Sequence, residues 1–364
     1  MCVNRNFAVH IQTQQPMFIV LIFAIALLVG CTDGKRDAVS GTAGQYAFAD
    51  DIRLKTTPVK DQQNAELGWA YAMLATIETE RLMQGDSVNL SPEYNVRRFI
   101  EEQAMDCYLR NTAANVSLRG FPSMMLAHLQ QYGAMSFDAY RTYESTDFGY
   151  VCNKVEQMAD VRRLHRDGLD AAKRAVADYL DDVIGPAPRY VFMYGCEYTV
   201  QEFAHSVCRS DEYVGITSFT HHPAGEWFSL EVEGNKYRDR LYNVSLDRMV
   251  SLVNASISSG HPVCWAGDVS EKGFCFADGV AVADDEKRQY TQHDRQKDFE
   301  YRHTTDDHCM AIVGMAHDKN GRRYYICKNS WGSNNRYGGM MYMSENYFRM
   351  KTIAIFMQRE RVFM

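Results

Sequence analysis

The chain has 364 residues, of which 46% are hydrophobic and 12% aromatic, and its formal net charge at pH 7 is −7. This length and hydrophobic content suffice for a large single domain or for two fused lobes. Acidic and basic residues are mixed along the chain without a basic stripe, so we expect no nucleic acid partner.

The N-terminal segment is predicted to be an export signal. Residues 17–30, MFIVLIFAIALLVG, are too short a run to span a bilayer comfortably but are typical of the apolar region of a signal peptide. The run leads into LVGC, which resembles the bacterial lipobox, whose cysteine becomes the lipidated first residue of the mature protein. We therefore predict a lipoprotein signal peptide over residues 1–30, a lipid anchor at Cys31 and a flexible tether over residues 31–51.

The protein would then be an exported bacterial lipoprotein of the cell envelope, on a membrane face that the sequence leaves open. An ordinary cleaved signal or an uncleaved anchor is the alternative reading of the same segment. Only one basic residue, Arg5, precedes the apolar run, which argues against export.

Helical patterns dominate the chain after the tether. Residues 65–84 repeat apolar side chains near one helical face, and a second helix is expected to start with Ser91 as N-cap and Pro92 at its first position. A third helix, within RGFPSMMLAHLQQYGAM, should stop at Gly133. The first half of the chain is therefore predicted to be rich in helices.

The middle and the end of the chain differ from each other. Residues 134–300 contain an amphipathic helix, VEQMADVRRLHRDGLDAAKRAVADYLDDVIG, and a helix leading into a strand, DRMVSLVNASISSGHPVCWAGDV. Later, HCMAIVGMAHD and RRYYICK predict strands joined by an Asn-Gly hairpin loop, and GGMMYMSENYF and TIAIFMQRE continue the strand pattern. We predict an α+β protein with two lobes and a large helical insertion.

The cysteines and histidines do not predict a metal site. Eight of the ten cysteines remain once Cys2 and Cys31 are set aside, and none of them forms a CxxC or CxxH motif. An exported protein could pair them, but several lie in apolar runs such as HPVCW, so we favour buried free thiols for most. His221, His222 and His317 have no metal-ligand spacing and are interpreted as structural or surface residues. We expect no cofactor.

Three segments together resemble the active site of papain-like cysteine peptidases. They are PVKDQQNAELGWAYA, DHCMAIVG and KNSWGS. In that family a nucleophilic Cys begins a helix, a Gln lies six residues before it and a Trp directly after it, and a His and an Asn follow far downstream. Gln62, Trp69, His308 and Asn329 match these positions in order and in local context.

The resemblance implies a role for each matching residue. His308 would shuttle the proton of the nucleophile, and Asn329 would hold the His308 imidazole in the required tautomer. Trp331 would shield that hydrogen bond from water. The Gln62 side chain and the backbone N–H of residue 68 would donate to the developing oxyanion.

Further segments narrow the resemblance to the bleomycin hydrolase and aminopeptidase C group. They are GHPVCWAGDV, SFTHHPAGEWFSLEVE, LYNVSLDRMV and YMSENYFRMKTIAI. This implies a papain-like two-lobed fold over residues 52–364, with a helical N-terminal lobe and an antiparallel β-sheet or barrel as C-terminal lobe. That group usually carries a C-terminal arm, whereas this sequence ends at Met364. Aminopeptidase specificity by that device and a ring-shaped hexamer are therefore in doubt, and a homo-oligomer is left open.

The nucleophile position is occupied by Gly68, which has no side chain. Cys309 and Tyr71 are expected to point away from the site, and no Ser or Cys lies between residues 58 and 83. Gln63 replaces the small Gly that is usual in the family. Glu66 adds a carboxylate that would oppose thiolate formation.

We therefore expect a peptidase homologue that binds a peptide or protein ligand in its cleft without hydrolysing it. The alternative is a cysteine-type (amino)peptidase by family, in which Gly68 is a recent or introduced loss of the nucleophile. Gly120, Phe121 and Pro122 fall where the family lines its substrate pocket, and a plain turn is the alternative for these three residues.

Overall fold

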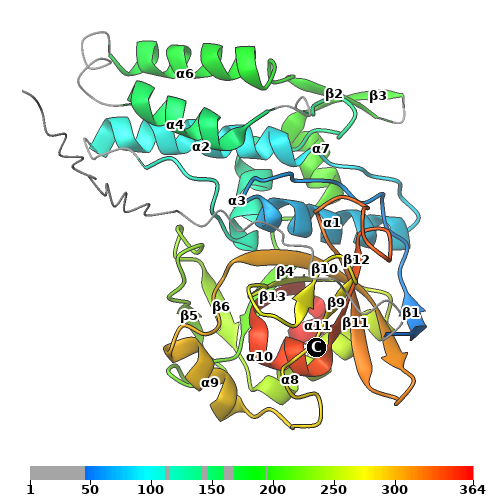
Figure 1. Cartoon of the computed structure of the whole chain (residues 1–364). Coiled ribbons are helices and arrows are strands. Elements are labelled where there is room, and N and C mark those ends of the chain that lie inside the picture. The colour runs from blue at the N-terminus through cyan, green and yellow to red at the C-terminus, as the bar shows by residue number, and fades with distance from the viewer. Residues whose placement is uncertain (1–45, 111–114, 142–145, 160–167, 194, 364) are drawn as a thin grey trace, which may run out of the picture. The chain divides into compact units, whose positions relative to one another are not determined.

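A computed structural model describes residues 46–110, 115–141, 146–159, 168–193 and 195–363 of the chain (Figure 1). These residues belong to one compact unit that spans Val39–Met364. The predicted signal peptide and Cys31 lie outside the described residues. Strand β1 (Phe48–Arg53) pairs with β10 (His308–Asp318), so regular structure begins before the predicted domain boundary at residue 52.

The helical part of the unit follows the predicted order. It consists of α1 (Gly68–Met83), α2 (Pro92–Arg110), α3 (Pro122–Tyr132), α4 (Phe148–Ala159), α6 (Leu169–Val183), α7 (Val200–Val207) and the hairpin of β2 (Tyr190–Met193) and β3 (Cys196–Thr199). The Ser91 hydroxyl accepts a hydrogen bond from the backbone N–H of Tyr94, as expected of an N-cap. Gly133 ends α3 with a φ of +87°, a conformation that glycine adopts without steric cost.

The described residues of the long amphipathic segment of the insertion do not form one continuous helix. They form α4 and α6, with residues 160–167 between them outside the described part of the chain. Both pack on α2, and Figure 1 shows the three helices side by side. This part of the insertion therefore enlarges the helical lobe, whereas the remainder, from residue 213 on, contributes strands to the sheet, so the insertion is not helical throughout.

The second part of the unit is an 11-stranded sheet with the order β5-β6-β4-β13-β7-β10-β11-β12-β9-β8 and with β1 added to β10. The strands not yet given are β4 (Tyr213–Thr217), β5 (Trp227–Ser229), β6 (Arg240–Asn243), β7 (Val263–Gly267), β8 (Phe274–Cys275), β9 (Val280–Ala281), β11 (Arg323–Lys328), β12 (Met340–Ser344) and β13 (Thr352–Gln358). All neighbouring strands are antiparallel except β4 with β6 and β9 with β12. Helices α8 (Leu246–Ser258), α9 (Gln292–Glu300), α10 (Glu345–Lys351) and α11 (Glu360–Phe363) accompany it.

One predicted strand is shorter than its pattern suggested. GGMMYMSENYF was expected to continue the strand pattern, and its first part is β12, but α10 begins directly after this strand. The Ser344 hydroxyl accepts a hydrogen bond from the backbone N–H of Tyr347, which caps this helix. A serine followed by Glu345 is a helix-start signal that the strand pattern concealed.

Helix α1 joins the two parts. Its residues from Gly68 to Glu80 are all buried, and it lies against both α3 and β10. A helix that is covered all round in this way belongs to the core of the protein. Its N-terminus therefore meets the start of β10, which begins with His308.

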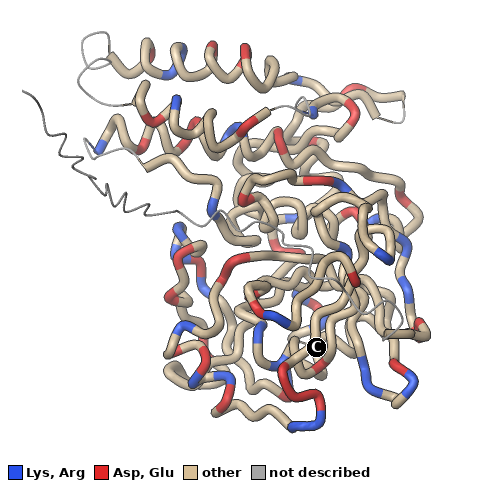
Figure 2. The backbone as a smooth tube through the Cα atoms, viewed as in Figure 1, with Lys and Arg blue, Asp and Glu red and all other residues tan. Residues whose placement is uncertain are grey.

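All eight cysteines outside the N-terminal segment are free thiols, and six of them are buried. This confirms the expectation of buried thiols for most of them. Cys196 is exposed and Cys275 is half-buried. Among the described residues, no helix is both long and apolar enough to cross a membrane. Figure 2 shows Lys and Arg interspersed with Asp and Glu along the tube.

Candidate active site

The residues predicted for the site come together where α1, β10 and the turn after β11 meet. Five of them, Gln62, Gly68, Trp69, Gly120 and His308, border a cavity of about 70 Å³. Its lining consists of Gln62, Glu66, Gly68, Trp69, Arg119, Gly120, Asp306, Asp307, His308 and Cys309. The N–H groups of an α-helix point toward its N-terminal end, and α1 begins at Gly68, which lines this cavity.

His308 and Asn329 have the geometry of a catalytic His–Asn pair. The His308 imidazole Nε2 lies 2.7 Å from Asn329 Oδ1, which also accepts the backbone N–H of Ser330 at 2.8 Å. The Asn329 oxygen therefore holds the proton of a neutral imidazole on Nε2 and turns Nδ1 toward α1. Trp331 covers the imidazole, with ring centroids 4.6 Å apart, and only 6% of His308 is exposed.

The His308 imidazole lies directly against Gly68. A Cβ built on Gly68 would lie 2.6 Å from His308 Nδ1, 2.9 Å from its Cε1 and 3.3 Å from the backbone nitrogen of Cys309. Contacts under 3.0 Å lie inside the van der Waals distance, so even an alanine requires the ring to move. The space for a catalytic side chain is therefore taken by the residue that would activate it.

The Gln62 side chain is held on both sides. Its Nε2 donates to the carbonyl oxygen of Ala65 at 2.6 Å, and its Oε1 accepts from the Ser330 hydroxyl at 2.6 Å. One of its two amide hydrogens is thus already used within the loop. Gln63 follows with a φ of +57°, a left-handed conformation that costs a residue other than glycine about 1 kcal/mol. The loop keeps the backbone shape that suits the glycine of the family.

Neither alternative nucleophile is placed to replace the missing sulfur. Burial raises the pKa of the Cys309 thiol well above its ordinary value, and neighbouring Cys264 raises it further, so the reactive thiolate is disfavoured. The Tyr71 hydroxyl donates to Glu93 at 2.8 Å and is also buried. Both side chains therefore serve packing and not attack.

Gly120 lines the cavity, whereas Phe121 and Pro122 do not. Gly120 packs under Trp69, since a Cβ on Gly120 would lie 2.6 Å from the indole Cε2. The indole Nε1 donates to the carbonyl oxygen of Leu118 at 2.8 Å. Phe121 is 1% exposed and contacts the ring of Phe356, and Pro122 starts α3. Trp69 thus fixes the segment that precedes Gly120.

An ion pair that the sequence did not predict crosses the site. Arg119 Nη2 lies 3.0 Å from Asp306 Oδ1, and Arg119 Nη1 lies 3.1 Å from Glu233. Burial disfavours the charge of Arg119, but Asp306, Glu233 and Glu66 outweigh this and raise its pKa. The only sequence signal was adjacency, because Arg119 precedes Gly120 and Asp306 comes shortly before His308.

His221 and His222 converge on Glu231, a partner that the sequence interpretation missed. Their possible ligand atoms all lie within 4.8 Å of one another, with both Nε2 atoms facing the carboxylate at 3.2 and 2.9 Å. The Gln296 amide oxygen accepts from the Thr220 N–H, so its NH₂ group faces His221 Nδ1. A neutral His221 then carries its proton on Nε2, the opposite of what a metal requires there. We interpret the group as a hydrogen-bonded anchor.

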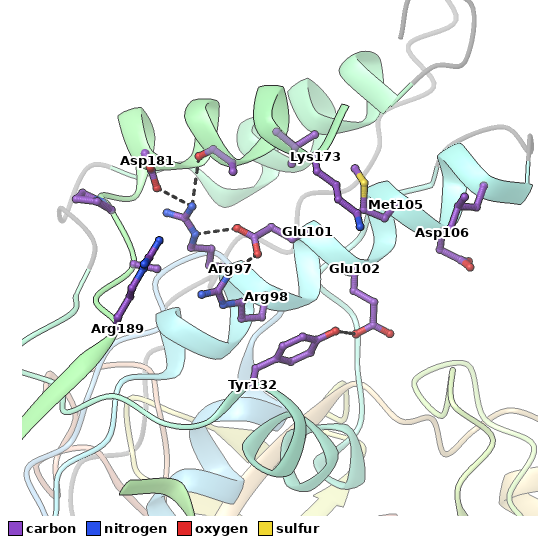
Figure 3. Close-up of a pocket in the computed structure, with 15 residues that line it drawn as sticks. Arg97, Arg98, Glu101, Glu102, Met105, Asp106, Tyr132, Lys173, Asp181 and Arg189 are labelled. Carbon is purple, nitrogen blue, oxygen red and sulfur yellow. Dashed lines mark hydrogen bonds and ion pairs between the residues drawn. The ribbon is translucent and has the colours of Figure 1, made fainter. Parts of the chain in front are cut away.

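A larger cavity lies away from the predicted site. It measures about 710 Å³ and lies between α2 and α6 (Figure 3). Arg97 crosses it and bonds Glu101 at 3.0 Å and Asp181 at 2.6 Å. The labelled Tyr132 hydroxyl donates to Glu102 at 3.1 Å. These paired side chains tie the insertion to α2 and contain no nucleophile–base pair.

The family comparison agrees with the fold. Residues 195–363 match the model of the Peptidase C1-like family. The crystal structure of PepW from Lactobacillus rhamnosis HN001 (DR20) has a TM-score of 0.66 and 18% identity to this chain, and covers 86% of this chain and 82% of PepW. Digestive procathepsin L 3 of Tenebrio molitor larval midgut has 16% identity to this chain, covers 86% of this chain and 71% of its own, and has a TM-score of 0.43. No curated protein matches this chain.

The chain has the α+β fold of papain-like peptidases. The match of residues 195–363 covers the part of the chain that carries His308 and Asn329.

Proposed function

We propose that this protein is a non-catalytic pseudopeptidase of the bleomycin hydrolase and aminopeptidase C type, whose cleft binds a peptide or protein ligand. The observation that carries the proposal is the contact between Gly68 and His308. A residue without a side chain stands at the nucleophile position, and the imidazole fills the space that a cysteine would need.

What remains of the machinery supports binding better than chemistry. His308, Asn329 and Trp331 still form the orienting group, and Gly68 still places a backbone N–H at the start of α1. An oxyanion hole without a nucleophile can speed attack by water, and roughly 10³-fold over the uncatalysed reaction remains in serine peptidases stripped of their triad. That residual rate is far below useful turnover.

The test is hydrolysis of a panel of short fluorogenic peptides by the purified protein and by the His308→Ala variant. We expect both proteins to release fluorophore at the same background rate, because no covalent intermediate can form on Gly68. A clear rate in the native protein that disappears in His308→Ala would overturn the proposal. It would instead favour an active peptidase with a nucleophile from elsewhere in the site.

A further inference from the structure

The loop between β5 and β6 reaches from the sheet to the helical part at the candidate active site. Ser229 of β5 pairs with Arg240 of β6, so residues 230–239 form the connection. Asn235 is buried and closes the base of this loop, because its side-chain amide donates to the carbonyl oxygens of Leu230 and Asp239. The loop therefore has a defined conformation of its own.

Gly234, near the tip of this loop, lies between the two walls of the site. Its backbone N–H donates to Asp306 Oδ2 at 2.6 Å. A Cβ on Gly234 would lie 2.7 Å from that oxygen and 2.9 Å from the carbonyl oxygen of Gly120. Asp306 belongs to the segment before His308, and Gly120 is the cavity residue at the substrate-lining position of the family. Only a glycine fits between them.

The residues around Gly234 attach the loop to the helical part through polar contacts. Glu233 pairs with Arg119, and Lys236 Nζ donates to the Ser117 hydroxyl at 2.6 Å. The Tyr237 hydroxyl donates to Glu102 at 2.8 Å, and the other end of the segment is bonded by His221 and His222 through Glu231. Partly exposed polar contacts of this kind each contribute little, so what holds the loop beyond them is the packing of Val232 and Tyr237 against the apolar core.

In this structure the site is too small for a peptide, and Gly234 lies against two of its lining residues, Gly120 and Asp306. The cavity beside His308 measures about 70 Å³, whereas binding pockets for small ligands span roughly 300–1,000 Å³. The volume of a single water in the liquid is about 30 Å³. The present cavity therefore holds a few waters at most.

We propose that residues 231–237 are an internal strap that occupies the ligand cleft and swings away when a peptide with an acidic residue followed by glycine takes its place. This inference rests on the proposed function, because it assigns the ligand and the regulation of the same cleft. The ligand class follows from the strap itself. Arg119 binds the carboxylate of Glu233, and the gap between Gly120 and Asp306 accepts only the glycine that follows.

The test weakens the strap and leaves both walls unchanged. The variant Glu233→Ala/Lys236→Ala removes two anchors, and Glu226→Ala/Lys272→Ala is the matched control, because both of its residues are exposed outside the strap. Hydrogen–deuterium exchange of the amides in residues 117–121 and 306–309 should become about tenfold faster in the strap variant only. Unchanged exchange in these segments would overturn the strap.

The ligand is probed with a fluorescein-labelled peptide, Val-Glu-Gly-Asn-Lys-Tyr, which copies residues 232–237. Its fluorescence polarisation should show binding to the strap variant that is at least about tenfold tighter than to the native protein, and bound peptide should return the exchange to the native rate. Equal binding to both proteins, or no binding despite faster exchange, would overturn the claim that the strap occupies a peptide site. Equal binding of Val-Lys-Gly-Asn-Lys-Tyr would contradict the acidic ligand class.

These readouts are independent of catalysis. A protein that hydrolysed peptides would refute the proposed pseudopeptidase even if the exchange and polarisation results were as expected. A protein without turnover whose cleft segments did not respond to the strap variant would refute the strap alone.

Discussion

Replacing Glu78 with alanine is expected to lower the free energy of unfolding by about 3–5 kcal/mol, the usual cost of removing one partner of a buried ion pair. Glu78 is fully buried in α1. Its carboxylate accepts from Lys60 Nζ at 2.6 Å and from the backbone N–H of Leu90 at 2.7 Å, and it also bonds the Thr57 hydroxyl. Lys328 Nζ lies 3.9 Å away. Alanine would leave both ammonium groups without this counter-charge.

This network fixes the loops that carry the candidate site residues to helix α1. Lys60 comes shortly before Gln62, and Lys328 directly precedes Asn329, so Glu78 ties both site loops to α1. Burial lowers the pKa of Lys328 to about 8 although Glu78 favours its charged form. Loss of the carboxylate should therefore loosen the Asn329 turn as well as destabilise the fold.

The measurement is urea unfolding followed by tryptophan fluorescence. Asp86→Ala is the control, because Asp86 is an exposed acid just beyond the same helix and should change stability by no more than about 0.5 kcal/mol. A loss below about 1 kcal/mol for Glu78→Ala would show that the network does not hold the two parts together.

Gly68→Cys is expected to leave the protein without peptidase activity and to cost about 1–3 kcal/mol of stability. The new Cβ would overlap the His308 imidazole, which Asn329 and Trp331 hold in place. A thiol at this position would also face Glu66, whose carboxylate lines the same cavity and opposes ionisation to the thiolate. Adding the thiol alone would therefore not restore a working catalytic site.

A double-mutant cycle identifies the clash as the cause. Gly68→Ala should destabilise the native protein by a similar amount. Introduced into the His308→Ala variant, the same substitution should cost much less, because the ring that the Cβ meets is gone. Additive losses would locate the strain elsewhere. Restored hydrolysis in Gly68→Cys would mean that the imidazole retreats readily, and it would favour the alternative of a recent or introduced loss of the nucleophile.

Local patterns predicted much of the fold. The capped start of α2, the glycine at the end of α3 and the apolar run of β10 each depend on residues that are close in sequence. The His–Asn–Trp group of the site was also predicted, because the motif resemblance supplied the long-range pairing that composition and periodicity lack. The helix α10 was missed because a strand pattern runs directly into its serine cap.

Local sequence patterns could not predict that the β5–β6 loop packs against the walls of the site. Gly234 reads in the sequence as one more turn glycine, and its contacts with Gly120 and Asp306 come from segments far apart in the chain. The same holds for the ion pairs of Arg119 and for the lysines around Glu78. The absence of a side chain at position 68 was plain from the sequence, but the place of the His308 ring against that position follows from packing.

The most direct test of the central claim, that the site has no nucleophile, is covalent trapping with a peptidyl vinyl sulfone followed by intact-mass and peptide mapping. It is made in the Cys196→Ser background, which removes the one exposed thiol among the described cysteines, with and without the strap substitutions Glu233→Ala/Lys236→Ala. We predict no adduct on any residue that lines the cavity. An adduct on Cys309 or another cavity residue that disappears in His308→Ala would contradict the account.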